Sequence, residues 1–200
     1  MTRRRGRPPK SSDPATRDRL LDAAAEACVE VGFEAVTVAG VAARAGVTPA
    51  AVYNHFTDKA DLMYSAGRVA IDGLNAKVAP VADPGRAAHE VVAAFLDPSF
   101  RDSRRLILEL HLAAGRHPEL ATHLAGWHRE FAGTSRERAS AALSDETVKA
   151  FFLLLLGLCH VDDLDAIEAR TEDLRERIDR LVDALYGDGA GAEVPGQRTQ

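Results

Sequence analysis

The chain of 200 residues contains little cysteine, few aromatic residues and no long apolar run. Its two cysteines, Cys28 and Cys159, lie far apart in apolar, helix-like stretches. They predict small buried side chains in a reducing compartment, with a redox-sensing pair as the alternative. The longest apolar run, Ala150 to Leu156, is far below the ~20 residues that a membrane span needs. The charged start is also unlike a signal peptide, so we expect a cytoplasmic protein.

Catalytic and metal-binding motifs are equally scarce. The sequence has no Gly-Ser nucleophile elbow, no P-loop, no His-Glu-x-x-His and no paired-cysteine motif, so we expect neither an enzyme nor a bound cofactor. Several histidines suggest a metal site. However, His123 and His128 are five positions apart, whereas two ligands on one helical face stand four apart. We therefore expect no metal site.

The alternating pattern of β-strands is also absent, and apolar residues recur at the three- and four-residue spacings of helices. The sequence therefore predicts an all-α protein of about nine helices. Expected segment boundaries are a basic arm over residues 1–12, a small helical head over 13–57, a larger helical domain over 58–187 and a tail over 188–200. The first long helix is expected to end at Gly32, which can adopt the C′ conformation.

Helix caps and a tight turn are concentrated between Thr37 and Lys59. Thr37 precedes a short amphipathic stretch and can cap it, and Gly46 can supply the positive φ of a turn. Thr48-Pro49 then begins another helix, because proline is favoured at the first helical position. Two short helices joined in this way predict a helix-turn-helix; a helical corner that serves only packing is the alternative.

The charge distribution is uneven along the chain. Overall the formal net charge is −5, which alone argues against nucleic-acid binding. However, residues 1–68 carry 10 Lys or Arg against 8 Asp or Glu, whereas residues 69–200 carry 15 against 22. The first ten residues hold five basic side chains and no acidic one. This asymmetry is typical of a protein that meets nucleic acid at one end only.

The segment from Thr37 to Leu62 resembles the DNA-binding signature of the TetR family of bacterial transcriptional regulators. The shared features are Thr37, Ala45-Gly46-Val47, Thr48, Tyr53-x-x-Phe56 and Lys59-x-x-Leu62, and the match covers about residues 13–65. The resemblance implies a three-helix DNA-binding head and a helical effector-binding and dimerisation domain. It also implies a regulator, commonly a repressor, that a small-molecule effector releases from DNA. A DNA-binding architectural or constitutive regulator without an effector is the alternative.

The resemblance also assigns DNA contacts to individual residues of the head. Tyr53, His55 and Lys59 match phosphate-contacting positions, while Thr37 and Thr48 match helix starts that hold the DNA backbone. Base edges would be met by Thr48, Pro49, Ala50 and Asn54. The Asn54 amide can pair with adenine, and the small apolar residues can contact thymine methyl groups. A dimer would read a palindromic operator with half-sites about one helical turn, or a multiple of it, apart.

The basic arm contains a second short motif. Arg5-Gly6-Arg7-Pro8 resembles the core of AT-hook peptides, in which an extended Arg-Gly-Arg segment enters a narrow A·T minor groove. Arg5 and Arg7 would make these contacts. A solvated basic tail that only adds attraction to phosphates is the alternative.

Two further sites follow from the resemblance, and the sequence offers candidates for both. An apolar or amphipathic effector would bind in the region 86–161, where core packing is the alternative role for the large side chains. The last two helices would pair with those of a second copy, because residues 151–156 are apolar all round and the final helix repeats apolar residues four and three apart. The candidate pocket residues are Phe95, Leu108, His111, Trp127, Phe131 and Phe152, and the candidate dimer residues are Phe151, Leu155, Leu174, Ile178, Leu181 and Leu185.

Overall fold

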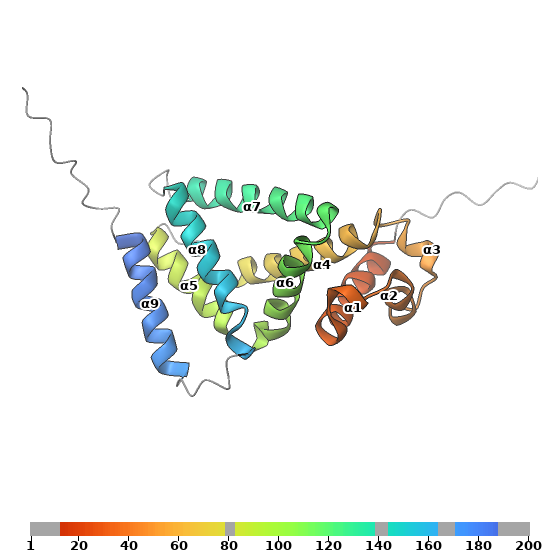
Figure 1. The fold of residues 1–200 in the computed structure, drawn as a ribbon, viewed down its shortest axis with the longest axis horizontal. Coiled ribbons are helices and arrows are strands. Elements are labelled where there is room, and N and C mark those ends of the chain that lie inside the picture. Colours follow the sequence, from red (N-terminus) through yellow and green to blue (C-terminus); the bar gives the residue numbers. More distant parts are fainter. Residues whose placement is uncertain (1–12, 79–82, 139–143, 164–170, 188–200) are drawn as a thin grey trace, which may run out of the picture.

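The computed structural model describes residues 13–78, 83–138, 144–163 and 171–187. Every regular element in these ranges is helical (Figure 1), which confirms the predicted all-α fold. The elements are α1 (Pro14–Ala35), α2 (Val38–Arg44), α3 (Pro49–Val52), α4 (Lys59–Lys77), α5 (Pro84–Leu96), the 3-10 turn η1 (Pro98–Phe100), α6 (Arg101–Ala114), α7 (Pro118–Arg138), α8 (Asp145–Leu158), the 3-10 turn η2 (Val161–Asp163) and α9 (Thr171–Gly187).

Side-chain caps begin most of these helices. In each case a carboxylate or hydroxyl oxygen accepts a hydrogen bond from a backbone N–H that has no partner inside the helix. The capping residues of α1 to α5 and of α8 are Asp13, Thr37, Thr48, Asp58, Asp83 and Ser144.

The first helix is interrupted at Gly32, where the sequence predicted its end, and a short helical segment continues to Ala35. Gly32 has φ 75° and ψ 159°, a conformation that side-chain-bearing residues rarely adopt. One more turn of α1 follows the bend. It directs Phe33 and Val36 into the interior, where they are 2% and 4% exposed.

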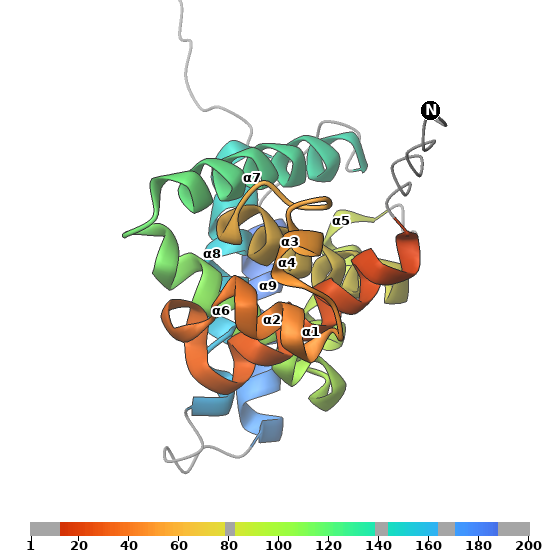
Figure 2. The same cartoon turned by 90° about the vertical axis from the view of Figure 1, so that its right-hand side faces the viewer.

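The molecule is elongated, with the head of α1, α2 and α3 at one end and α9 at the other (Figure 1). Figure 2 looks at the head end-on, with α4 and α6 behind it. One apolar cluster joins the head to α4, α6 and α7, so the head is not a separate unit. A second cluster unites α5, α8 and α9 with parts of α4 and α6. Because α4 and α6 contribute to both clusters, packing connects the two ends.

Polar contacts reinforce each end of this arrangement. At the end away from the head, His89 on α5 lies 3.1 Å from Asp179 and 2.8 Å from Asp183 on α9. At the junction with the head, Glu34 lies 2.9 Å from Arg116 and 3.1 Å from His117. Polar contacts thus join α5 to α9 and join the end of α1 to the α6–α7 connection, in addition to apolar packing.

Both cysteines are free and buried, as predicted. Burial raises the pKa of the Cys28 and Cys159 thiols to about 12. The thiolate, which is the reactive form, is therefore scarce at neutral pH. Among the described helices, none combines the length and the apolar character that a bilayer crossing requires.

Candidate nucleic-acid interface and internal cavity

The helix-turn-helix is built by local capping and by a glycine turn. Thr37 Oγ1 accepts from the Gly40 N–H at 3.0 Å, and Thr48 Oγ1 accepts from the Ala51 N–H at 3.3 Å. Between the two helices, Gly46 adopts φ 70°, and a Cβ built on it would meet nothing within 4 Å. The inward residues Val41, Ala42, Val52 and Phe56 are each at most 3% exposed and fix α2 and α3 to the rest of the head.

The outer surface of α3 carries the side chains predicted to read DNA. Tyr53 is 59% exposed, one of the most exposed large hydrophobic side chains of the described residues. Thr48, Pro49, Ala50 and Asn54 are also exposed. In Figure 1, α3 lies at the end of the molecule farthest from α9. The structure therefore brings together, on one accessible surface, a phenol, an amide and small apolar groups.

Lys59 and His55 are placed differently from the other predicted contacts. Lys59 Nζ donates to the Glu34 carbonyl oxygen at 3.3 Å and lies 4.4 Å from the centre of the Phe33 ring. Burial lowers the pKa of Lys59, although Glu34 opposes this change. A phosphate contact would require the ammonium group to leave these partners. His55 is half-buried beside Phe56, at 6.2 Å between ring centres. Arg5 and Arg7 lie outside the described residues.

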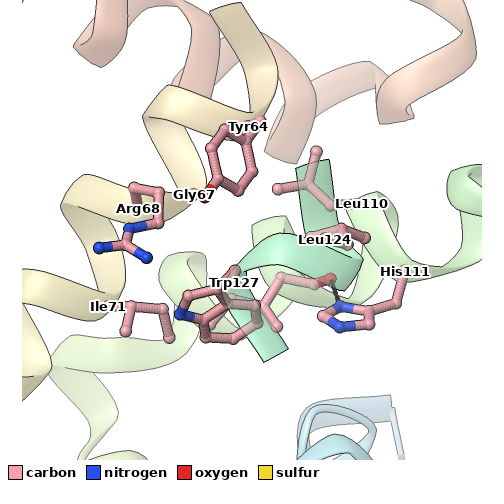
Figure 3. A pocket seen from close by; sticks show the side chains of 9 residues that line it. Tyr64, Gly67, Arg68, Ile71, Leu110, His111, Leu124 and Trp127 are labelled. Carbon is pink, nitrogen blue, oxygen red and sulfur yellow. Dashed lines mark hydrogen bonds between the residues drawn. The ribbon is translucent and has the colours of Figure 1, made fainter. Parts of the chain in front are cut away.

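A small internal cavity lies between α4, α6 and α7 (Figure 3). Its volume is about 10 Å³, which is close to the minimum for one water molecule. Of the six predicted pocket residues, His111 and Trp127 line it. The other residues that line it are Tyr64, Gly67, Arg68, Ile71, Ile107, Leu110 and Leu124.

The other four predicted pocket residues do not line this cavity. Phe152 and Phe131 lie beside it, with ring centres 5.8 Å apart for Trp127 and Phe152 and 5.9 Å apart for Phe131 and Phe152. Phe95 and Leu108 instead belong to the second apolar cluster, where they are 2% and 5% exposed. Phe95 lies on α5 and Leu108 on α6, and both pack in this cluster with residues of α8 and α9.

Two histidines form a neutral pair next to the cavity. His111 Nδ1 lies 2.8 Å from the Ile107 carbonyl oxygen, so this nitrogen carries the proton and donates. His111 Nε2 then accepts from His128 Nε2, 3.1 Å away. Burial lowers the pKa of both imidazoles, and that of His128 falls to about 4, with His111 as a further cause. In the described part of the chain, no three potential ligands gather as a metal site.

Comparison with known proteins assigns the chain to a family. Residues 20–66 match the model for bacterial regulatory proteins of the tetR family, and residues 79–187 match that for a tetracyclin repressor-like C-terminal domain. The chain belongs to the TetR family. The resemblance seen in the sequence is thereby confirmed.

Curated relatives and solved structures agree with this assignment. The chain is 32% identical over 121 residues to the HTH-type transcriptional regulator BetI of Stenotrophomonas maltophilia, an alignment that covers 57% of this chain and 62% of BetI. It is 38% identical over 93 residues to the uncharacterized HTH-type regulator YdeS of Bacillus subtilis, covering 46% and 43% of the two chains. The chain thus spans less than two thirds of the length of either relative.

Two solved structures share the fold. A TetR-family regulator from Rhodococcus sp. superposes with a TM-score of 0.67 at 23% identity, covering 87% of this chain and all of the other. The multidrug binding protein EbrR in complex with ethidium gives a TM-score of 0.62 at 28% identity, covering 86% and 99% of the two chains.

The α4 wall of the cavity in this TetR-family chain was missed in the sequence. Tyr64, Gly67, Arg68 and Ile71 repeat at the spacing of one helical face, so a signal was present. Their mixed chemistry hid it, because the face combines an aromatic, a glycine and a charged residue. Gly67 allows α4 to approach α6, since a Cβ there would lie 2.6 Å from Leu110 Cδ1. Arg68 reaches Glu130 on α7 at 2.6 Å.

The six predicted dimer residues differ in how far the protomer itself buries them. Phe151, Leu155 and Ile178 are 4%, 8% and 3% exposed, inside the protomer's own core. They face inward because α8 and α9 pack on each other and on α5. Leu181 is 55% exposed, and Leu174 and Leu185 are half-buried. Leu153 of α8, which is not among these six residues, is 66% exposed.

Proposed function

We propose that this TetR-family chain is a sequence-specific DNA-binding regulator, that it acts as a homodimer, and that a small apolar or amphipathic effector releases it from its operator. The observation that carries the proposal is the outer surface of α3. Buried residues fix the inner side of this helix, and Thr48 directly before it and Tyr53 and Asn54 directly after it are exposed to solvent. Rigid placement of such groups is what base-edge and phosphate contacts require.

Each exposed group has a distinct role in the proposed complex. The Tyr53 hydroxyl is suited to a phosphate, which sets the position of the head on the duplex. The Asn54 amide is suited to the paired donor and acceptor of adenine, which specifies sequence. Pro49 and Ala50 present only apolar atoms, which suit thymine methyl groups.

Effector binding would act through α4. This helix starts at Lys59, directly after the head, and its residues Tyr64 to Ile71 form one wall of the internal cavity. Small-molecule sites usually occupy about 300–1,000 Å³, so an effector has to widen a cavity of about 10 Å³. Widening displaces α4 relative to α6 and α7 and therefore moves the head. An effector that binds the displaced state more tightly than the DNA-binding state lowers the affinity for DNA. The loss of DNA-binding free energy is limited by the difference between the effector's binding free energies for the two states. The solved complexes of EbrR with imidazole and with ethidium support a small-molecule effector.

The partner surface would lie on α8 and α9. Leu153 and Leu181 expose large apolar side chains on these helices, and burying them is the expected driving force for association. Two heads held by one dimer would then read two half-sites of a palindromic operator.

The experiment that tests the regulator is fluorescence anisotropy with DNA from upstream of the protein's own gene, at several salt concentrations and with excess unrelated DNA. We expect tight binding that survives the competitor and is lost in Tyr53→Ala. Val31→Ala is the control, because Val31 is 57% exposed on the same head but lies on α1. Weak binding that is equal on all DNA and disappears with salt would reject the proposal.

A further inference from the structure

A larger hollow lies at the junction between the head and the rest of the molecule. Its volume is about 340 Å³, within the range of small-molecule sites. It is lined by α1 from the head and by α4 and α6 from the larger domain, and it shares no lining residue with the internal cavity of Figure 3. Its apolar lining includes Leu21, Ala25, Val29, Val69, Ala70 and Leu106.

The charged residues of this junction groove are all acidic. They are Asp22, Glu26 and Glu30 on α1 and Asp102 on α6, and no Lys, Arg or His lines the groove. Arg44, outside the lining, reaches Glu26 at 3.2 Å and also pairs with Glu30. Asp22 and Asp102 have no side-chain hydrogen bond or ion pair within the ranges that the structure describes. Arg44 thus offsets Glu26 and Glu30, whereas no basic residue of the lining offsets Asp22 or Asp102.

We propose that the junction groove binds an organic cation with an apolar body. The apolar body would cover the exposed side of Val69, which is 49% exposed, and the positive charge would face Asp22 and Asp102. The lining requires both the positive charge and the apolar body of the ligand. An anion would be repelled by the four carboxylates, and a small hydrated cation would leave the apolar side chains of the groove in contact with water.

The basic arm of the chain is a competing occupant. It supplies five positive charges, but its sequence, Met-Thr-Arg-Arg-Arg-Gly-Arg-Pro-Pro-Lys-Ser-Ser, contains one methionine and two prolines as its only apolar side chains. The apolar lining therefore favours a compact ligand with a larger apolar body. This site lies beyond the proposed function, since it is separate from the α4–α6–α7 cavity and needs no DNA.

Two probes of the same size and shape isolate the charge requirement. Isothermal titration of the full chain without DNA is carried out with tetraphenylphosphonium, a cation, and tetraphenylborate, an anion. We expect saturable binding of one tetraphenylphosphonium per chain, weakened by added salt, and no comparable binding of tetraphenylborate. Equal binding of both ions, or no saturable binding of the cation, overturns the proposal.

Substitutions then locate the site. We expect Asp22→Asn and Asp102→Asn each to weaken binding about two- to fivefold, the effect of one solvent-exposed charge pair. Asp18→Asn is the matched control, because Asp18 is exposed one turn earlier on α1 and does not line the groove. Val69→Trp is expected to fill the groove and abolish binding, whereas Val31→Trp, at an exposed valine elsewhere on α1, retains it.

The remaining outcomes are equally decisive. Leu124→Trp is expected to fill the internal cavity. If the cation still binds to Val69→Trp but no longer binds to Leu124→Trp, its site is the internal cavity, and the assignment to the junction groove is overturned. A chain in which the arm has lost most of its charge tests the other occupant. If the cation binds only to the variant that combines Arg3→Gln, Arg4→Gln, Arg5→Gln and Arg7→Gln, the arm occupies the groove and the proposal is overturned. Operator binding is measured separately by anisotropy, so a chain that binds the cation but no operator refutes only the proposed function.

Discussion

The backbone N–H of Phe33 donates to Glu109 Oε2, 3.2 Å away, and so joins the end of α1 to the middle of α6. The bend at Gly32 makes this bond possible, because it releases the Phe33 N–H from helical hydrogen bonding. The approach is close enough that a Cβ on Gly32 would lie 3.1 Å from the same carboxylate oxygen. The Glu109 side chain of the larger domain thus accepts a hydrogen bond from a backbone N–H of the head.

Replacing Glu109 should show what this contact contributes. Glu109→Ala leaves a partly buried N–H without its acceptor, and we expect a loss of about 1–3 kcal/mol in the free energy of unfolding, measured in urea. Glu109→Gln keeps an acceptor oxygen and should lose clearly less. Glu109 also pairs with Arg105 at 3.2 Å. Equal losses in both variants would assign the stabilisation to that charge pair instead.

Arg104 is the one charged residue that is buried in the described part of the chain, at 2% exposure. Its guanidinium donates to both carboxylate oxygens of Asp162 and to the carbonyl oxygens of Phe95 and Asp97. An ammonium group cannot span these acceptors and leaves some of them without a donor, so we expect Arg104→Lys to lower the free energy of unfolding in urea by about 1–3 kcal/mol. Arg101→Lys is the control, because Arg101 is 65% exposed and lies 3.8 Å from the same carboxylate. A comparable loss in both variants would contradict the role of burial.

The His111–His128 pair predicts acid sensitivity. Burial places the pKa of His128 at about 4, below the ordinary value of 6.5, so between these pH values the unfolded chain binds more protons than the folded one. Stability should therefore fall as pH decreases from 6.5 towards 4. We expect His128→Gln, which can still donate to His111 but cannot become charged there, to flatten this slope in urea unfolding measured at several pH values. An unchanged slope would show that other groups cause the acid sensitivity.

The exposed leucine of α9 tests the proposed partner surface. We expect Leu181→Glu to convert the dimer to a monomer in sedimentation experiments and to weaken operator binding, because a desolvated carboxylate opposes association. Leu112→Glu on α6 is the matched control, since Leu112 is 53% exposed and Leu181 is 55% exposed. A monomeric wild-type chain, or the same effect in both variants, would contradict the assignment.

The head was predictable from the sequence because its signals are local. Thr37, Gly46 and Thr48 act within three or four positions of themselves, and the structure gives each the predicted conformation. Lys59 shows the limit, because its partner, the Glu34 carbonyl, is 25 positions away.

The rest of the fold depends on contacts that no local pattern records. Phe151 and Ile178 look equally suited to a core and to a partner surface, and only the packing of α8 and α9 against α5 decides between the two. The cavity wall on α4 was hidden by its mixed chemistry, and α6 and α7, which complete the cavity, come from distant parts of the chain.

Two glycines of α4 offer a matched test of that wall. A Cβ on Gly73 meets nothing within 4 Å, so Gly73→Ala should stabilise the helix by up to ~1 kcal/mol. A Cβ on Gly67 lies 2.6 Å from Leu110 Cδ1, and Leu110 is 2% exposed beside a cavity of about 10 Å³. Too little space remains for the displaced methyl group, so we expect Gly67→Ala to lower the free energy of unfolding.

The difference in stability between these two variants reports how easily Leu110 can be displaced beside the cavity. Overpacking costs about 1–3 kcal/mol, so we expect the thermal midpoint of Gly67→Ala to lie several degrees below that of Gly73→Ala. If both variants are stabilised equally, Leu110 moves aside at little cost and the cavity opens readily. In that case, widening the cavity costs an effector little of its binding free energy. If Gly67→Ala is destabilised as expected, α4 and α6 are tightly fitted at this point. A ligand that separates them must then displace α4, and the head with it.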